Sequence, residues 1–218
     1  MRSFKKGFSI LTIAFCLVLI FASSAYAYEY IYNRVLNVPT YEQEKSYWCG
    51  PACLQMVIKY VTGSLISQAT LASEAGTTPT SGTYVYKMAE TLRAHSVNSK
   101  YYSVYNVDFD TTLRSSLDKG IPAIAHLCTR YLPAYNGKNY GHYVVLRGRY
   151  IYFNDPGIDP QSVEEICEGE IAQAIYINEL YYTDPYDGLP GVYGRHTVPP
   201  SVMLKAIKDN AGYFIASK

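Results

Sequence analysis

The stretch Ser46-Tyr47-Trp48-Cys49-Gly50-Pro51-Ala52-Cys53 marks the point where polar, irregular sequence changes into a run with helical periodicity. Beyond it, apolar residues recur at intervals of three and four as far as Val61, and Gly63 follows where a helix C-cap is expected. Pro51 falls in the first turn, where a helix tolerates proline without losing a hydrogen bond. The sequence therefore predicts a helix over residues 49–62 that begins at a cysteine.

Other elements are predicted on both sides of this helix along the chain. Helical patterns cover residues 67–75, 84–95, 108–119 and 201–209, and strand-like patterns cover residues 34–39, 98–107, 121–128 and a segment beyond 175. Residues 142–148 and 150–154 predict two strands joined tightly through Gly148-Arg149, as in a β-hairpin. Because helices come first and antiparallel strands follow, the pattern indicates an α+β fold in one domain.

The N-terminus has the composition of an export signal. Basic residues precede a nearly unbroken apolar run over residues 8–21, and Ala25-Tyr26-Ala27 supplies the small residues of a cleavage site. The alternative is an uncleaved anchor, but the run is shorter than the ~20 residues that span a bilayer. We expect cleavage after Ala27, a mature domain over residues 28–218, a secreted or extracytoplasmic location and no stable membrane insertion.

Net charge and cysteine spacing indicate which kinds of partner and cofactor the chain is not expected to bind. The mature chain keeps 16 Lys and Arg against 18 Asp and Glu, because the signal carries three of the 19 basic residues and no acidic ones. A chain without a basic face or a polybasic block is not expected to bind nucleic acid or an anionic membrane. No Cys-x-x-Cys pair is present, so neither a zinc site nor another cofactor is predicted. The oligomeric state is left open.

Four cysteines remain after the signal, and an exported chain pairs an even number of them by default. If Cys49 is a nucleophile it must stay free, so Cys53 either pairs with Cys128 or Cys167 or is buried as a small apolar residue. A thiolate is favoured at a helix N-terminus by unpaired N–H groups and aligned peptide dipoles. Cys49 is in that position, whereas Cys53 lies one turn deeper and is expected to be inert.

Three further residues could complete an acyl-transfer site around Cys49. His142 follows Gly141 at the start of a strand and is the candidate base, with mid-strand His126 as its competitor. Asp155 closes the next strand, where a short hairpin would bring it to the second imidazole nitrogen. Gln43 lies six residues before Cys49 and offers a side-chain amide to an oxyanion.

These motifs resemble those of the papain-like peptidases that cleave bacteriocin leaders, and of their stand-alone exported relatives. The similar residues are Gln43, the Cys49–Cys53 block with its helix, Gly141–Val145 and Asn154-Asp155-Pro156. The resemblance implies a papain-like fold in which the nucleophile helix packs on an antiparallel sheet. It implies Cys49 as nucleophile, His142 as base, Asp155 as its orienting residue and Gln43 as oxyanion donor. It leaves residues from about 161 onward uncovered, as a C-terminal extension.

The sequence is compatible with three functions. The first is an exported cysteine peptidase that acts on a peptide or protein through an acyl-enzyme. The second is acyl transfer or isopeptide cleavage by the same residues. The third is a non-catalytic module in which Cys49 is tied in a disulfide and a tyrosine-rich groove binds peptide or cell-wall polymer.

Overall fold

The computed structural model describes residues 28–155 and 175–218, with side chains for residues 31–152 and 178–218. The chain divides into two compact units, of which residues 31–151 and 177–218 form the larger. Three strands continue from it into the smaller unit. The predicted signal segment and Cys167 lie outside the described residues, so both expectations stay predictions.

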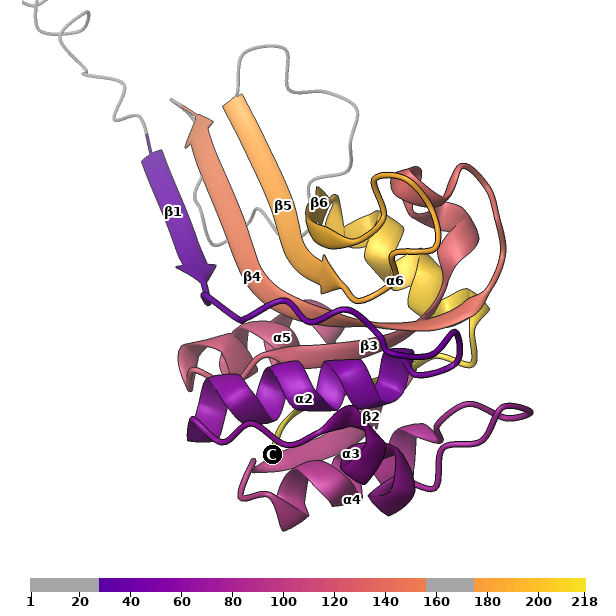
Figure 1. Cartoon of the computed structure of the whole chain (residues 1–218). Helices are drawn as coiled ribbons and strands as arrows, with labels where there is room; N and C mark the ends of the chain where they lie inside the picture. Colours follow the sequence, from indigo (N-terminus) through magenta and orange to yellow (C-terminus); the bar gives the residue numbers. More distant parts are fainter. Residues whose placement is uncertain (1–27, 156–174) are drawn as a thin grey trace, which may run out of the picture. The chain divides into compact units, whose positions relative to one another are not determined.

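The helices and strands follow one another in the order shown in Figure 1. The helices are α2 (Cys49–Thr62), α3 (Gln68–Glu74), α4 (Val85–Ala94), α5 (Phe109–Asp118) and α6 (Pro200–Asp209), with short 3₁₀ turns η1 (Thr129–Tyr131) and η2 (Pro133–Tyr135). The strands are β1 (Tyr28–Val35), β2 (Ser99–Ser103), β3 (Ala123–Cys128), β4 (Gly141–Asp155), β5 (Ile175–Asp184), β6 (Gly194–Val198) and β7 (Tyr213–Ser217).

Within the described residues these strands form one seven-stranded sheet in the order β2-β7-β3-β4-β5-β6, and β1 pairs with β4. The registers of β2–β7, β3–β4, β3–β7 and β5–β6 are all antiparallel. In the β3–β4 register, Leu127 is the partner of His142. The start of β4 therefore lies beside the end of β3, and the end of β5 lies on its other side.

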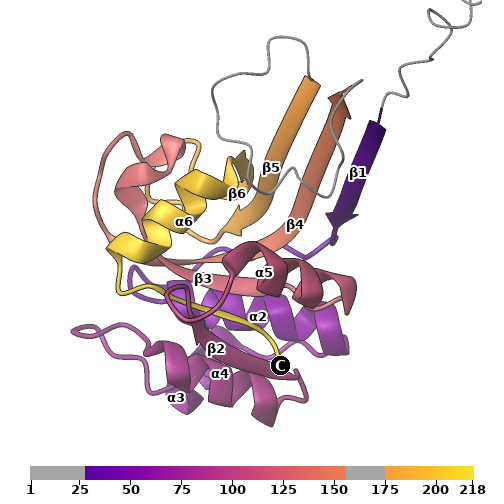
Figure 2. The same cartoon turned by 180° about the vertical axis from the view of Figure 1, so that it is seen from behind.

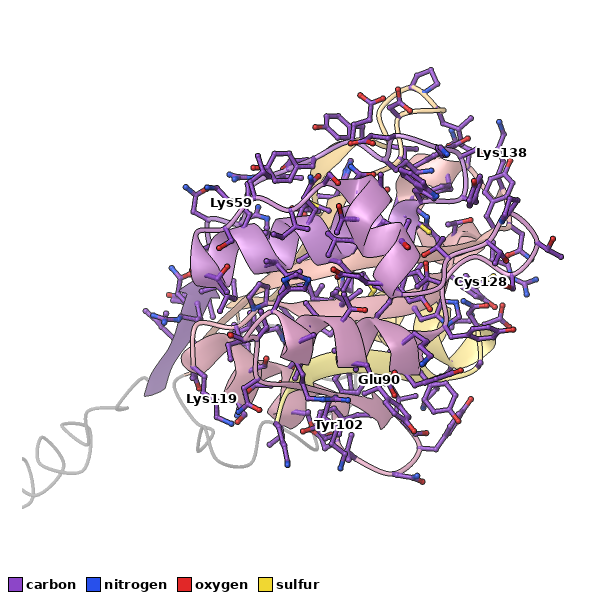
Figure 3. All side chains as sticks on the ribbon, turned by 60° about the horizontal axis from the view of Figure 1, so that its bottom comes forward. Lys59, Glu90, Tyr102, Lys119, Cys128 and Lys138 are labelled. Carbon is purple, nitrogen blue, oxygen red and sulfur yellow. The ribbon has the colours of Figure 1, made fainter. Side chains whose placement is uncertain are left out.

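Helices cover both faces of the sheet. Helix α2 lies in front of β3 in Figure 1 and behind it in Figure 2, whereas α5 comes to the front in Figure 2. Helix α6 contacts β3 and β7 on the α5 side, and α4 contacts β2 and β7 on the other. In Figure 3, Lys59 marks the last turn of α2 and Lys119 the end of α5. The arrangement is the α+β layout that the sequence predicts.

Helix α2 is the central element of the core. Every residue from Gly50 to Ile58 is buried, so this half of the helix is enclosed all round rather than on one face. Helices α3 and α4 supply part of the enclosure. Gly63 ends the helix in the left-handed conformation at φ 77°, and its N–H bonds the carbonyl of Lys59. The predicted helix over 49–62 is confirmed with both of its ends.

Two strand predictions are wrong in informative ways. The lead-in strand expected over 34–39 is β1, which ends at Val35, and the segment after it has no regular structure. The hairpin expected through Gly148-Arg149 does not form, because β4 runs unbroken from Gly141 to Asp155. A Cβ on Gly148 would lie 2.9 Å from the Cα of Val35, so this glycine allows close approach of β1.

Among the described helices, none has the length and apolar character needed to cross a bilayer.

Candidate active site

Cys49 is the first residue of α2, and its side chain is partly exposed and free of any disulfide. No side chain caps this helix N-terminus, and no acidic residue lies in the first turn. Within the described residues, the N–H groups of the first turn are therefore not bonded to a capping side chain. Such N–H groups can donate hydrogen bonds to an oxygen on which negative charge develops beside Cys49.

His142 lies next to this sulfur, near the beginning of β4, and is 6% exposed. Its Nε2 atom donates a hydrogen bond of 2.9 Å to Oδ1 of Asp184, and a hydrogen bond also joins the ring to Cys49. Since Nε2 is taken by Asp184, the nitrogen available to Cys49 is Nδ1. Burial alone would lower the pKa of His142, but the charges and hydrogen bonds of Asp184 and Cys49 raise it to about 10. The raised pKa favours the protonated, imidazolium form of the His142 ring.

Asp184 is the last residue of β5 and is fully buried. Its Oδ1 accepts from His142 and from the backbone N–H of Tyr186 at 2.9 Å, and its Oδ2 accepts from the hydroxyl of Tyr135 at 2.9 Å. Three donors meet one carboxylate, so its buried charge is well satisfied. The carboxylate is fixed in place behind the imidazole.

The sequence assigned this contact to a different residue, Asp155, and that assignment is corrected to Asp184. The assignment rested on a tight hairpin at residues 148–149, which would have returned the chain to His142 after a few residues. Instead Asp155 is the last residue of β4, the strand that has His142 near its start, and β5 supplies the neighbouring position. The side chain of Asp155 is outside the described part of the structure.

A signal for Asp184 was nevertheless present. Asp-Pro occurs at residues 155, 159 and 184, and Asp184-Pro185 follows a strand-like run just as Asp155-Pro156 does. Sequence spacing favours the first of them only if the connection between the strands is short. Here the chain takes 19 further residues, 156–174, before β5 begins.

Gln43 lies in the irregular segment before α2 and is 6% exposed. Its Nε2 donates to the carbonyl of Lys45 at 2.9 Å, and its backbone N–H donates to the carbonyl of Pro185 at 2.9 Å. Among the described residues its Oε1 has no hydrogen-bond partner. A carboxamide nitrogen carries two protons, so the second remains available to a ligand.

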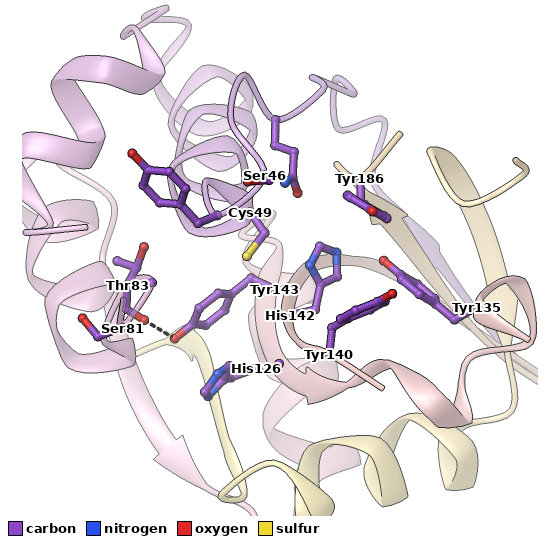
Figure 4. A pocket seen from close by; sticks show the side chains of 14 residues that line it. Ser46, Cys49, Ser81, Thr83, His126, Tyr135, Tyr140, His142, Tyr143 and Tyr186 are labelled. Carbon is purple, nitrogen blue, oxygen red and sulfur yellow. Dashed lines mark hydrogen bonds between the residues drawn. The ribbon is translucent and has the colours of Figure 1, made fainter. Parts of the chain in front are cut away.

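Gln43, Cys49 and His142 line one pocket of about 500 Å³ (Figure 4). Cys49 projects into it from the start of α2, beside His142 and Tyr143. The remaining walls are Ser46, Tyr47, Ser81, Gly82, Thr83, His126, Tyr135, Tyr140, Gly141 and Tyr186. No Lys, Arg, Asp or Glu is among these lining residues, so the titratable side chains of the pocket wall are Cys49, the tyrosines and the two imidazoles.

The competing candidates occupy less suitable positions. His126 stacks on Tyr143 with ring centroids 4.4 Å apart, and burial together with the positive charge of His142 lowers its pKa to about 4. Cys53 is fully buried, and burial raises the pKa of its thiol. Cys49, Cys53 and Cys128 are all free, so the pairing of Cys53 with Cys128 is excluded.

In the described part of the chain, no group of three or more His, Cys, Asp or Glu side chains is placed to hold a metal ion. What the site offers is a thiol, an imidazole, a carboxylate behind it and an amide beside it. This set of groups is suited to acyl transfer through a sulfur nucleophile.

Comparison with known proteins agrees with this chemistry. The profile of the Peptidase_C39 like family matches residues 35–183, more than half of the chain, and ends one residue before Asp184. No curated protein sequence matches the chain.

Similar folds occur among solved structures. The peptidase domain of Streptococcus ComA, a bifunctional ABC transporter of a quorum-sensing pathway, is 22% identical with a TM-score of 0.50, over 84% of this chain and 100% of that one. A double glycine motif protease from an AMS/PCAT transporter, in complex with a leader peptide, is 17% identical with a TM-score of 0.47, over 85% and 96%. The stem bromelain precursor is 11% identical with a TM-score of 0.47, over 82% and 66%.

The family match and the α+β fold, with Cys49 at the start of α2, lead to one conclusion. This chain belongs to the Peptidase_C39 like family and is a cysteine peptidase with a papain-like fold.

Proposed function

We propose that the chain is an exported peptidase that hydrolyses peptide bonds through Cys49, His142 and Asp184, with Gln43 in the oxyanion hole. The observation that supports it most is the unbroken line of contacts from the Cys49 sulfur through the His142 ring to Asp184. Cys49 and His142 both line the pocket.

In the first half of the reaction, the Cys49 thiolate attacks the substrate carbonyl carbon and a C–S bond forms. The negative charge moves to the carbonyl oxygen, where the second N–H of Gln43 and the N–H groups at the start of α2 stabilise it. The imidazolium of His142 then gives its proton to the leaving amine as the C–N bond breaks. An acyl-enzyme on Cys49 and a free amine result.

In the second half, neutral His142 takes a proton from a water molecule, which attacks the acyl carbon. The C–S bond breaks, the acid product leaves, and the thiolate–imidazolium pair is restored. Asp184 does not exchange protons in this scheme. It keeps Nε2 protonated and Nδ1 directed to the sulfur, which fixes the tautomer and the ring plane.

The extracytoplasmic location is part of the proposal and rests on residues 1–27 alone. A thiol nucleophile outside the cytosol must escape oxidation and pairing. The free state of Cys49, Cys53 and Cys128 is consistent with that requirement and does not favour a disulfide-tied binding module.

Loss of turnover in two variants tests the proposal. We expect Cys49→Ala and His142→Ala each to reduce cleavage of a peptide substrate by at least roughly 10³-fold, because each removes a group that acts as part of one unit. Circular dichroism and thermal unfolding should show that both variants remain folded. Cys53→Ala is the matched control, since it removes a thiol from the same helix outside the pocket. Full turnover in folded Cys49→Ala would rule the proposal out.

A further inference from the structure

The segment that carries Gln43 has no helix or strand of its own. Residues 36–48 lie between β1 and α2 as loop and turn, yet the proposed reaction needs the Gln43 amide at a fixed distance from Cys49. A misplacement of about 1 Å in such a group costs roughly 10²-fold in rate. Something outside the segment must therefore hold it.

The side chain that does so is Gln68, the first residue of α3 and 1% exposed. Its Nε2 donates to the carbonyl of Glu42 at 2.6 Å, and its Oε1 accepts from the backbone N–H of Glu44 at 3.0 Å. These are the two residues on either side of Gln43. The carboxamide thus bonds the chain as a neighbouring strand would, with one donor and one acceptor in a single plane.

Only one orientation of this carboxamide satisfies its surroundings. The second proton of Gln68 Nε2 reaches Oε1 of Gln55 at 3.2 Å, and Gln55 Nε2 in turn donates to the carbonyl of Ile66 at 2.8 Å. Exchanging the oxygen and nitrogen of Gln68 would set oxygen against oxygen and nitrogen against N–H. Gln55 belongs to α2, so this contact also fixes the position of the loop relative to the helix that carries Cys49.

A second anchor acts on Gln43 from the other side. Its own backbone N–H donates to Pro185, the residue after Asp184. Glu42, Gln43 and Glu44 are therefore all held by backbone hydrogen bonds to groups distant in sequence. Of these holding groups only Gln68 is a side chain, so only it can be removed by substitution.

We propose that Gln68 is a positioning residue of the oxyanion hole, which acts by fixing the backbone on both sides of Gln43. The inference rests on the proposed function, because it presumes that Gln43 stabilises the oxyanion. Gln68 does not line the pocket and does not touch substrate. Its loss should weaken stabilisation of the transition state while leaving the thiolate and ground-state binding nearly unchanged.

The test compares two reagents that attack Cys49 differently. A peptide aldehyde forms a hemithioacetal whose oxygen occupies the oxyanion hole, whereas iodoacetamide alkylates the sulfur without forming an oxyanion. In Gln68→Met we expect kcat to fall roughly 10- to 100-fold, aldehyde affinity to fall by a similar factor, and both KM and the alkylation rate to stay within about threefold.

Gln55→Met is the matched control, because it disrupts the same buried pair of glutamines but leaves both bonds to Glu42 and Glu44. It should lower stability without the loss of aldehyde affinity. If Gln68→Met does not fold, Gln68→Asn serves instead, since it keeps the amide but shortens its reach by one methylene.

Unchanged aldehyde affinity in a folded Gln68 variant would overturn the inference, as would an equal loss in Gln55→Met or an equal loss of alkylation rate. The aldehyde and alkylation measurements do not require turnover, so the two proposals fail separately. A wild-type protein that neither cleaves peptides nor binds the aldehyde contradicts the proposed function instead, and the role of Gln68 with it.

Discussion

Two thiols one turn apart on α2 are in opposite surroundings. Cys49 opens into the pocket beside His142, whereas Cys53 is enclosed in the core with a raised thiol pKa. We expect iodoacetamide at neutral pH to label Cys49 at least roughly 10²-fold faster than Cys53 or the buried Cys128, because only an ionised and accessible thiol reacts. Peptide mapping by mass spectrometry measures this. Equal labelling of Cys53 would show that the two environments are not as described.

The raised pKa of His142 also makes folding stability depend on pH. An imidazole has an ordinary pKa near ~6.5 when unfolded and about 10 here, so the folded state retains a proton that the unfolded state releases. The stabilisation is complete below about pH 6.5 and is lost as the pH rises through about 10. We expect the free energy of unfolding to fall over this range and to fall less in His142→Ala.

Urea denaturation at several pH values between those limits measures the effect. The comparison with His142→Ala removes contributions from other groups that titrate in the same window. An identical pH dependence in the two proteins would mean that His142 is not held as a cation in the folded state.

At the scale of the element, the two ends of α2 have glycine for different reasons. A Cβ on Gly50 would lie 2.4 Å from Oγ1 and 2.8 Å from Cβ of Thr83, which is part of the pocket wall. Gly63 has open space around it but a left-handed backbone. One glycine is required by packing against the site and the other by backbone conformation.

These reasons predict different outcomes for the same substitution. Gly50→Ala should lower stability by about 1–3 kcal/mol and also reduce kcat/KM, because the crowded wall must shift. Gly63→Ala should lower stability by about 1–2 kcal/mol with kcat/KM unchanged, since its strain is confined to the helix end. Denaturation and peptide cleavage assays separate the two. Equal activity loss in both variants would contradict the assignment.

Helices were more predictable from the sequence than strands, for a physical reason. The periodicity of α2 and α5 is local, and so is the cap of α5, where Asp108 accepts a hydrogen bond from the N–H of Thr111. Strand β7 lies between β2 and β3 in the sheet, but it was not predicted. Its place depends on partners more than 80 residues away, which a local pattern does not record.

The site residues show the same contrast between local sequence signals and contacts that depend on the whole fold. Cys49 and Gln43 were proposed from a helix start and a short spacing, and His142 from a glycine before a strand; all three line the same pocket. Asp184 could not be chosen over Asp155, because the choice depends on the length of the connection between β4 and β5. Gln68 gave no signal at all, since a buried glutamine on a short helix is defined only by what it touches.

At the scale of the whole molecule, the N-terminal residue of the released protein tests the proposed export. We expect expression in a bacterial host to yield an extracytoplasmic protein that begins at Tyr28, because small residues at positions 25 and 27 direct cleavage after Ala27. N-terminal sequencing of the released protein measures this, and a variant lacking residues 2–27 should remain in the cytosol. A membrane-bound product with residues 1–27 intact would favour the anchor.

The central claim is that a carboxylate from β5 orients the catalytic imidazole. Its most direct test is the pH profile of kcat/KM for the wild-type protein, Asp184→Asn and Asp155→Asn. We predict that Asp184→Asn loses roughly 10²- to 10⁴-fold in kcat/KM and that its alkaline limit falls from near about 10 toward that of an ordinary imidazole. Asp155→Asn should stay within about twofold of wild type. Loss of activity in Asp155→Asn with Asp184→Asn unaffected would contradict the account.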